Sequence, residues 1–510
     1  MEREEFRDLA VNDQAELERI KTGAMASPLY NEDLAPTGPE RRTWTTYNIA
    51  ALWIGMAIVI TTYSLAAGLM AAGMNWWQAL LTISLGNLLV LVPMLLNAHA
   101  GTRYGIPFPV FVRASFGVRG ANFAAMARAL VACGWFGIQT WIGGLALDAL
   151  MSAAFGGWAN VPGHSFITFF VFWAIQLVII LRGVEGVKTF ESVAAPLLLI
   201  GSLVLLIWGF YAGGGIASVF ATSAKLQEGE APFWALFWPS LAANVGYWIT
   251  LSLNIPDFTR YAKTQRSQVL GQALGLPLTM TAFSFIGIAV TAATIVVFDE
   301  AIWDPVVLVT RLAQNAPLLL IVAMVIIAIA QISTNMAANV VSPSFDFSNL
   351  APKYISFRTG GLITAIIGIV SFPWVLFNNI GAYIFTWLVG YGSLLGAIGA
   401  VMIVDYWIVR RRQLDLAELY KLDGRYSYSG GWNWKAIVAV FIGVIPVVPG
   451  FLKAAATAGL NGGPFPNPTF IEGLYNYGLF LTFTVSGLVY LGLSMIGGRA
   501  AEPAREPETT

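Results

Sequence analysis

Primary amides and indoles occur inside long apolar stretches of this 510-residue chain, where polar partners are scarce. In GWFGIQTW, Trp135 and Gln139 are four residues apart and therefore share one helix face. In AQISTNMAANVV the same spacing aligns Gln331, Asn335 and Asn339. An amide surrounded by hydrocarbon is strongly unfavourable unless it finds a hydrogen-bond partner. These side chains are therefore expected either to bind a polar ligand or to join helices.

The residue types favour a flat, uncharged ring as the ligand. An Asn or Gln side chain offers one acceptor and a two-proton donor, which matches the edge of a lactam or ureide, and indoles supply stacking faces. No Asp, Glu, Lys, Arg or His lies near the middle of either stretch, whereas a charged ligand would need a buried counter-charge. The alternative is that the amides are contacts between helices, each worth about 1 kcal/mol. That role does not require a neighbouring indole.

Two other apolar stretches are interrupted by glycine. The first, ALWIGMAIVITTYSLAAGLMAAG, contains Gly55 and Gly68; the second, LAANVGYWITLSLNIPDFTRY, contains Asn244 and Gly246 and ends near Pro256. They are the first members of two consecutive sets of five apolar stretches. Matched interruptions of this kind predict discontinuous helices whose free carbonyl groups can coordinate a cation. Alternatively, the glycines only allow close packing of helices.

The protein that positions these amides, indoles and glycines is expected to be an all-α integral membrane protein. The chain is 57% hydrophobic and only 11% charged, whereas soluble proteins carry roughly 25% charged residues. A helix needs about 20 mostly apolar residues to cross the hydrocarbon core. That length predicts about twelve spans, near residues 48–72, 76–97, 122–153, 165–182, 193–212, 232–253, 273–298, 316–340, 361–377, 380–404, 434–452 and 473–496.

The basic residues indicate the orientation of the spans. With the N-terminus in the cytoplasm, the cytoplasmic segments hold all of the 28 Lys and Arg residues except Arg128, Lys225, Arg311 and Lys453. Because cytoplasmic loops are rich in Lys and Arg, we expect a multi-pass protein of the inner or plasma membrane with both termini cytoplasmic. The segment 98–120 is too polar to span, and we expect it to be a cytoplasmic re-entrant or amphipathic connection.

Polar composition predicts that both ends of the chain are disordered cytoplasmic tails, at 1–45 and 497–510. The first apolar run begins only near Ile49, so no cleavable signal is predicted. The net charge of zero does not favour a nucleic acid partner. One cysteine and two histidines, His99 and His164, do not assemble into a disulfide framework, a metal cluster or a catalytic triad. An enzyme and an organic cofactor are therefore not expected.

Several strings, taken in order between about Leu29 and Arg412, resemble family 1 of the nucleobase–cation symporters, which includes hydantoin, allantoin, uracil and cytosine permeases. The strings are LYNEDLAPTGPERRTW, ALWIGMA, YGIPFPVFVRASFG, GWFGIQTW, LNIPDFTRYAK, STNMAAN and DYWIVRRR. The resemblance is closer to the hydantoin and allantoin branch. It implies the leucine-transporter-like fold of two inverted five-helix repeats, here at 46–212 and 231–404, followed by two additional helices at 434–496.

The resemblance also implies a binding site. The ring would stack between the two indoles, with hydrogen bonds from three amides and from the backbone near a tyrosine; these residues are Trp135, Trp248, Gln139, Asn335, Asn339 and Tyr247. A sodium ion would be held by three carbonyl groups and two hydroxyl groups, from Gly55, Ile58, Ala330, Ser333 and Thr334. Oxygen ligands of this kind suit a hard cation. Leu388 would match the family's gate.

Gly55 in the cation site and Ala397, where the tenth span often has proline, are mild departures from the family pattern, and a third departure bears on the substrate. Val59 stands where some relatives carry an amide, so one partner of the ring is missing and hydantoin, allantoin and pyrimidines all remain as substrates. The expected function is import of such a neutral ring by cation symport with alternating access, coupled to sodium or to protons.

Other functions also fit the sequence. The main alternative is a proton-coupled transporter of another small solute, such as cytosine, a purine, a vitamin-like ring or an amino acid. A channel and a membrane-embedded enzyme are further alternatives, and Trp135 and Trp248 could instead be lipid-interface anchors. The expected partners are the ring, the coupling cation and the lipid bilayer, whereas the oligomeric state is not indicated.

Overall fold

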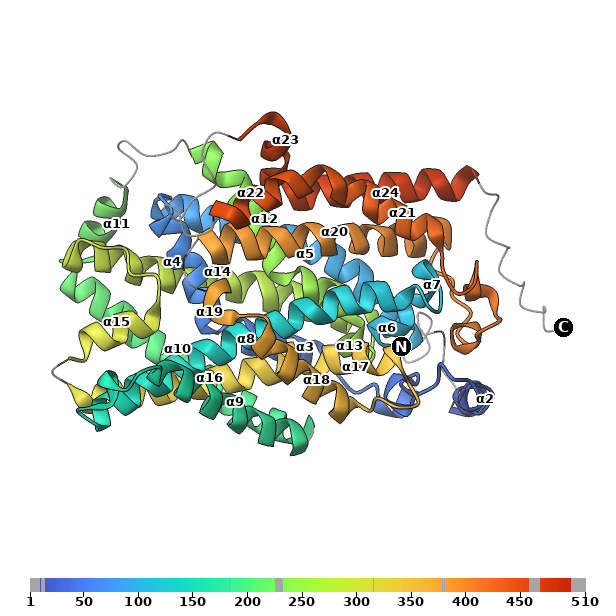
Figure 1. The fold of residues 1–510 in the computed structure, drawn as a ribbon, viewed down its shortest axis with the longest axis horizontal. Helices are drawn as coiled ribbons and strands as arrows, with labels where there is room; N and C mark the ends of the chain where they lie inside the picture. Colours follow the sequence, from blue (N-terminus) through green and yellow to red (C-terminus); the bar gives the residue numbers. More distant parts are fainter. Residues whose placement is uncertain are drawn as a thin grey trace.

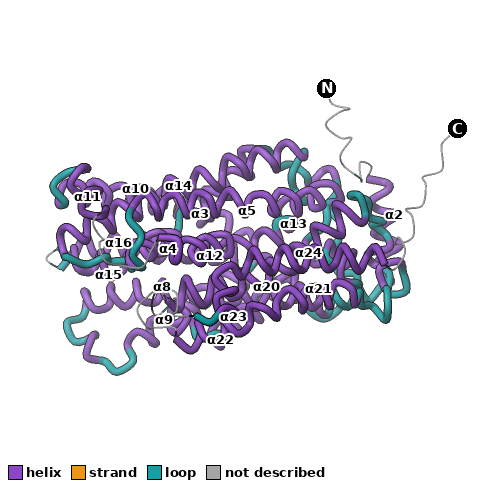
Figure 2. Tube along the Cα trace, turned by 90° about the horizontal axis from the view of Figure 1, so that it is seen from above, coloured by secondary structure: helices purple, strands orange, loops and turns teal. Residues whose placement is uncertain are grey.

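The computed structural model describes residues 10, 14–182, 184–224, 233–314, 316–377, 379, 381–457 and 468–496, with the backbone alone for 182, 184–195 and 222–224. The expected tail at 497–510 lies outside the described residues, as do most of the first 13. Within the described part the fold is all helical and contains no strand (Figure 2). The long helices run side by side along one axis, with α2, α6 and α7 at one end and α11 and α15 at the other (Figure 1).

Eight helical segments in the described ranges are long and apolar enough to cross a bilayer. They are α5 (Trp76–Tyr104), α8 (Ala121–Ala154), α9 (His164–Arg182), α14 (Gln265–Phe298), α16 (Pro317–Asn339) with α17 (Val341–Leu350), η5 (Gly381–Leu388) with α20 (Val389–Ile403) and η6 (Val404–Val409), α21 (Trp434–Val444) with α22 (Val448–Thr457), and α23 (Phe470–Gly473) with α24 (Gly478–Ile496).

A ninth span is the bent pair α3 (Thr46–Ala57) and α4 (Ile60–Ala71), whose axes differ by 57°. Three more expected spans correspond to α10 (Val184–Ala212), α12 (Phe233–Asn254) and α18 (Phe357–Val370). The prediction of an all-helical membrane protein with about twelve spans is confirmed. Short helices complete the described part: α2 (Gln14–Met25), α6 (Phe108–Phe111), α7 (Arg113–Phe116), α11 (Ile216–Ala224), α13 (Pro256–Thr259), α15 (Pro305–Leu312) and α19 (Pro373–Leu376).

The first span is discontinuous, as its sequence predicts. Helix α3 ends at Ala57, Val59 is extended with φ −149° and ψ 155°, and α4 begins at Ile60. Because a helix leaves its last carbonyl groups without intrahelical partners, the end of α3 presents free backbone oxygens in the interior of the protein.

The sixth span differs from the prediction. We expected an interruption near Asn244 and Gly246, but α12 is continuous to Asn254 and the chain turns only at Ile255, before Pro256. Gly246 has a packing role instead, since a Cβ atom there would lie 2.6 Å from the carbonyl oxygen of Leu388. The absence of a side chain lets α12 and the tenth span meet backbone to backbone.

The N-terminal segment is ordered, so the prediction of a disordered tail is wrong for its described part. Residues 27–45, here called the N-terminal strap, lie against loops from distant parts of the chain. The amide of Asn31 donates to the Pro352 carbonyl at 2.8 Å, and the Tyr420 hydroxyl donates to the Leu34 carbonyl at 2.8 Å. Leu34 is fully buried. These contacts over 300 residues apart in sequence could not be seen in a polar composition.

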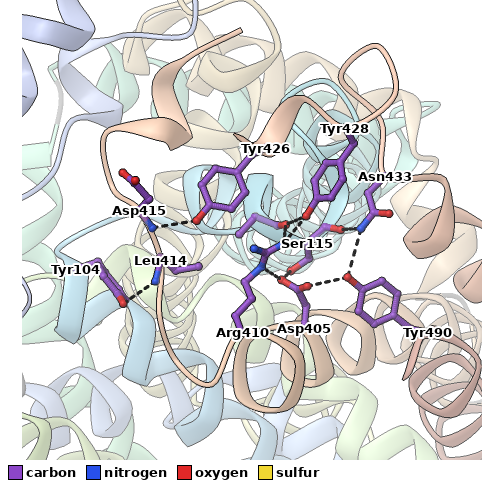
Figure 3. Close-up of polar contacts among 11 residues, drawn as sticks. Tyr104, Ser115, Asp405, Arg410, Leu414, Asp415, Tyr426, Tyr428, Asn433 and Tyr490 are labelled. Carbon is purple, nitrogen blue, oxygen red and sulfur yellow. Dashed lines mark hydrogen bonds and ion pairs between the residues drawn. The ribbon is translucent and has the colours of Figure 1, made fainter. Parts of the chain in front are cut away.

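The connection between α5 and α8 is buried rather than amphipathic. Its second short helix, α7, is held by a cluster around Asp405, the Asp405 clamp (Figure 3), and in its first, α6, the Phe108 N–H donates to Asp257 at 2.8 Å. Asp405 pairs with Arg410 at 2.7 Å and accepts hydrogen bonds from Ser115 at 3.2 Å and Tyr490 at 2.7 Å. Arg410 also donates to the Ala114 carbonyl at 2.9 Å. The clamp therefore joins α7, the end of the tenth span and α24.

Candidate functional site

A cavity lies where the broken first span meets α8, α12 and α16. Its empty volume, which includes the open space at its mouth, is about 320 Å³. The lining residues combine two indoles, a phenol, two primary amides and two hydroxyl groups with apolar side chains, and none is charged. They are Met56, Val59, Trp135, Gln139, Tyr247, Trp248, Thr250, Leu251, Thr334, Ala338 and Asn339.

Both indoles named from the sequence line this cavity, and perpendicular ring contacts hold them. The Trp135 ring lies 5.2 Å from that of Tyr247, at 78° between planes. The Trp248 ring lies 4.9 Å from Tyr247 at 83° and 5.2 Å from Trp53 at 84°. Edge-to-face geometry of this kind is favourable for aromatic pairs. Trp135 and Trp248 are only 5% and 4% exposed, so they are not anchors at a lipid–water interface.

Tyr247 contributes its side chain rather than its backbone. Helix α12 is continuous at this point, so the backbone groups of Tyr247 belong to the helix ladder. Its hydroxyl group lies 2.7 Å from the Thr61 hydroxyl and 3.1 Å from that of Thr62, both in α4. The phenol therefore touches both indoles with its ring and is tied to α4, the second half of the broken span, by its hydroxyl group.

The three amides assigned to the ring have different environments. Gln139 lines the cavity, and its Oε1 atom is buried without a hydrogen-bond partner among the described residues. Asn339 also lines the cavity and donates its amide to Oδ1 of Asn335 at 2.9 Å. Asn335 is not among the lining residues: its amide donates to Oε1 of Gln176 at 2.7 Å and to Thr140 at 3.2 Å. The structure therefore brings Gln139 and Asn339 to the cavity and places Asn335 behind it.

The residues named for a cation come from two neighbouring elements. Gly55 and Ile58 lie at the end of α3 and at the helix break, and Ala330, Ser333 and Thr334 lie on α16, which packs against α3 and α4. Both hydroxyl residues are buried. Carbonyl oxygens at a helix end and hydroxyl oxygens are the kinds of ligand that a hard cation prefers. Among the described residues no cluster of His, Cys, Asp and Glu could hold a metal.

Sequence reasoning missed the aromatic side of the tenth span. Tyr383, Trp387 and Tyr391 are spaced four residues apart and surround Trp135, with ring centroids at 6.1, 6.5 and 6.5 Å. Their spacing in GAYIFTWLVGYG is the signal that could have identified them. Leu388, named as a gate, is fully buried between them, with its carbonyl against Gly246.

These features define a polytopic transporter for a small solute: about twelve spans, the first of them broken, around an uncharged cavity of indoles and amides. Residues 36–463 match the model of a family described as permease for cytosine/purines, uracil, thiamine, allantoin. The chain belongs to this permease family, and the resemblance seen in its sequence strings is confirmed. It is a transporter and not an enzyme.

Named proteins share most of the chain. A purine-uracil permease of Arabidopsis thaliana is 42% identical over 91% of this chain and 77% of its own length. An allantoin permease of Bacillus subtilis is 37% identical over 92% of this chain and 94% of its own length. The protein Mhp1, a nucleobase-cation-symport-1 family transporter, has been solved in a closed form with bromovinylhydantoin bound. That structure has a TM-score of 0.72 and 26% identity, covering 92% of this chain and 96% of Mhp1.

Proposed function

We propose that this protein imports a neutral ring of the hydantoin, allantoin or uracil class by cation symport with alternating access. The observation that carries the proposal is a cavity that combines two indoles with two primary amides and has no charged lining residue. A flat ring with alternating donors and acceptors matches such a lining. The substrate names of the relatives, purine-uracil and allantoin, have the same chemistry.

In the proposed complex the ring stacks between Trp135 and Trp248. The free Oε1 atom of Gln139 accepts a hydrogen bond from a ring N–H, and Asn339 bonds the opposite edge. Asn335 acts through Asn339, because its Oδ1 atom holds one N–H of the Asn339 amide. Val59 offers no hydrogen bond, so the ring edge beside it makes only apolar contact.

We further propose sodium as the coupling ion, at the site formed by Gly55, Ile58, Ala330, Ser333 and Thr334. Thr334 lines the cavity as well, which gives the cation and the ring a shared wall. Binding of either ligand would then favour binding of the other, by the same factor in both directions. The five-helix repeats at 46–212 and 231–404 and the additional pair at 434–496 are part of this proposal.

The experiment is equilibrium binding to the purified protein, followed by uptake into proteoliposomes. The panel is hydantoin, allantoin, uracil, cytosine and thiamine, each in sodium and in choline buffer at equal ionic strength. We expect saturable binding of at least one neutral ring, tighter in sodium. Binding of thiamine alone would overturn the neutral-ring assignment. Equal affinity in the two buffers, with uptake driven by a pH gradient, would replace sodium by protons.

The orientation, with both termini in the cytoplasm of an inner or plasma membrane, is proposed from the basic residues and is tested separately. In a Cys133→Ala background, Gly156→Cys should react with an impermeant thiol reagent added outside intact cells, and Gln413→Cys should react only after lysis. Both positions are exposed, and a Cβ atom at Gly156 meets no other atom within 4 Å. The reverse pattern of labelling would invert the proposed topology.

A further inference from the structure

The indole N–H of Trp135 has a partner, and that partner belongs to the tenth span. Trp135 Nε1 donates to the hydroxyl oxygen of Tyr391 at 3.1 Å. Trp248, the other indole of the cavity, has no such partner: its Nε1 atom is buried without a hydrogen bond among the described residues. The two walls of the proposed stacking site therefore differ, because only one has its in-plane orientation fixed by a hydrogen bond.

The tenth span reaches Trp135 through a helical segment of unusual geometry. Residues Gly381–Leu388 form a π-helix, and a second π-helix, Val404–Val409, ends the same span. Such segments are rare and occur mostly at functional sites. The first one carries Tyr383 and Trp387 and leads directly into the turn of Tyr391 (Figure 1, α20). All three rings contact the same indole.

The tenth span also contacts the backbone of α8 and the backbone of α4. A Cβ atom at Gly134 would lie 2.4 Å from the Trp387 ring, so that ring sits directly on the α8 backbone next to Trp135. The Tyr383 hydroxyl donates to the Thr61 carbonyl of α4 at 3.2 Å. The tenth span thus contacts α8 and the broken first span at the same time.

We propose that Tyr391 is a positioning residue for substrate binding, in which its hydroxyl group holds the Trp135 indole in the orientation that stacks on the ring. This inference rests on the proposed function, because it concerns the same cavity. The bond exists only while the tenth span lies against α8. The stacking surface for the substrate is therefore complete only when the tenth span packs against α8. The affinity for the substrate then depends on the position of the tenth span.

Packing alone does not account for the hydroxyl group. A phenylalanine at position 391 would supply the same ring contact with Trp387, whose centroid lies 4.9 Å from that of Tyr391. What the hydroxyl adds is an acceptor for the indole N–H, and a buried N–H left without one is unfavourable. The role is therefore testable by removing one oxygen atom.

The test is a double-mutant cycle on the full-length protein. Tyr391→Phe should raise the KM for the transported ring roughly two- to tenfold, the range of one neutral hydrogen bond, with Vmax changed less than about twofold. In a Trp135→Phe background, which lacks the indole N–H, Tyr391→Phe should have almost no further effect. The matched control is Tyr383→Phe, which loses a hydroxyl group bonded to Thr61 instead. Its effect should be the same in both backgrounds.

A second measurement needs no substrate. In protein labelled with ¹⁵N-tryptophan, the indole N–H signal that disappears in Trp135→Phe identifies Trp135. Tyr391→Phe should move that signal upfield, whereas Tyr383→Phe should leave it nearly in place. An unmoved signal in Tyr391→Phe, or equal KM effects in the two backgrounds, would overturn the inference. Failure of the wild type to bind any ring of the panel would contradict the proposed function alone. In that case, a shift of the Trp135 indole signal in Tyr391→Phe would still show that the Tyr391 hydroxyl group holds the indole.

Discussion

Asn335 and Asn339 are one helical turn apart, yet replacing each by leucine should have different consequences. Asn339 lines the cavity, whereas Asn335 joins α16 to α8 and α9 through Thr140 and Gln176. We expect Asn335→Leu mainly to destabilise the fold and Asn339→Leu mainly to weaken substrate binding. Both changes keep a side chain of similar volume, so packing is disturbed little.

The magnitudes follow from the hydrogen bonds that each change removes. Asn335→Leu leaves two buried groups without their only described partner, the Gln176 Oε1 atom and the Asn339 amide. Hydrogen bonds between membrane helices are worth about 0.6 kcal/mol on average, and a buried group left unpaired costs about 1–3 kcal/mol. The two groups together predict a loss of about 1–6 kcal/mol of stability. Asn339→Leu removes one of these bonds and one proposed ligand contact, so it should lower affinity about tenfold.

The assay pairs thermal unfolding in detergent with binding of the best ring of the panel. Asn335→Leu should unfold at a clearly lower temperature, and the fraction that stays folded should bind with only modestly reduced affinity, through the freed Asn339 amide. Asn339→Leu should keep most of its unfolding temperature and change the rank order of ring analogues. If Asn335→Leu unfolds like the wild type and loses affinity as strongly as Asn339→Leu, then Asn335 contacts the ring directly and does not act mainly in joining the helices.

Three further outcomes are expected. Thr334→Ala should weaken binding in sodium while leaving binding in choline nearly unchanged; equal losses in both would place Thr334 on the ring alone. Trp135→Ala should lose about 1–3 kcal/mol of binding free energy, the value of one aromatic stacking partner, whereas Trp434→Ala, at a 55% exposed side chain, should not change affinity. Arg128→Met should destabilise the protein by about 3–5 kcal/mol, because it leaves the fully buried Asp346, 3.3 Å away, without its counter-charge; unchanged unfolding with a functional protein would contradict this.

Local patterns in the sequence were enough to predict the spans and three polar or aromatic lining residues, Trp135, Gln139 and Asn339, whereas Tyr247, Trp248 and Thr334 were assigned only through the family resemblance. Trp135 and Gln139 could be named because a spacing of four places them on one helix face, and the structure puts both at the cavity. The break in the first span was also predictable. The glycine in the sixth span led to a wrong prediction, because glycine occurs both where a helix is interrupted and where two backbones pack closely. Gly246 serves the contact, and only the position of Leu388 reveals it.

Contacts between distant segments were not predictable from local patterns. Whether Asn335 faces the cavity or Gln176 depends on how α16 and α9 pack. The spacing of residues along α16 shows which of them share a face, but not which helix that face contacts. The aromatic residues of the tenth span were overlooked because aromatic residues are common in apolar spans, and only their position around Trp135 distinguishes them. The N-terminal strap has a polar composition typical of disorder, yet it folds because loops made much later provide its partners.

The N-terminal strap is synthesised long before the loops that it contacts, and this has a consequence for folding. Its residues leave the ribosome before their partners, since Pro352 follows Asn31 by 321 residues and Tyr420 follows Leu34 by 386. The segment therefore waits, with Leu34 uncovered, until ten spans have been synthesised, and it docks only when their loops are correctly arranged. A chain that is truncated or misinserted before Tyr420 retains a strap whose apolar side chains, such as Leu34, stay uncovered, and chaperones and proteases can recognise it. Docking of the strap thus reports that the loops before the ninth span and after the tenth are in place.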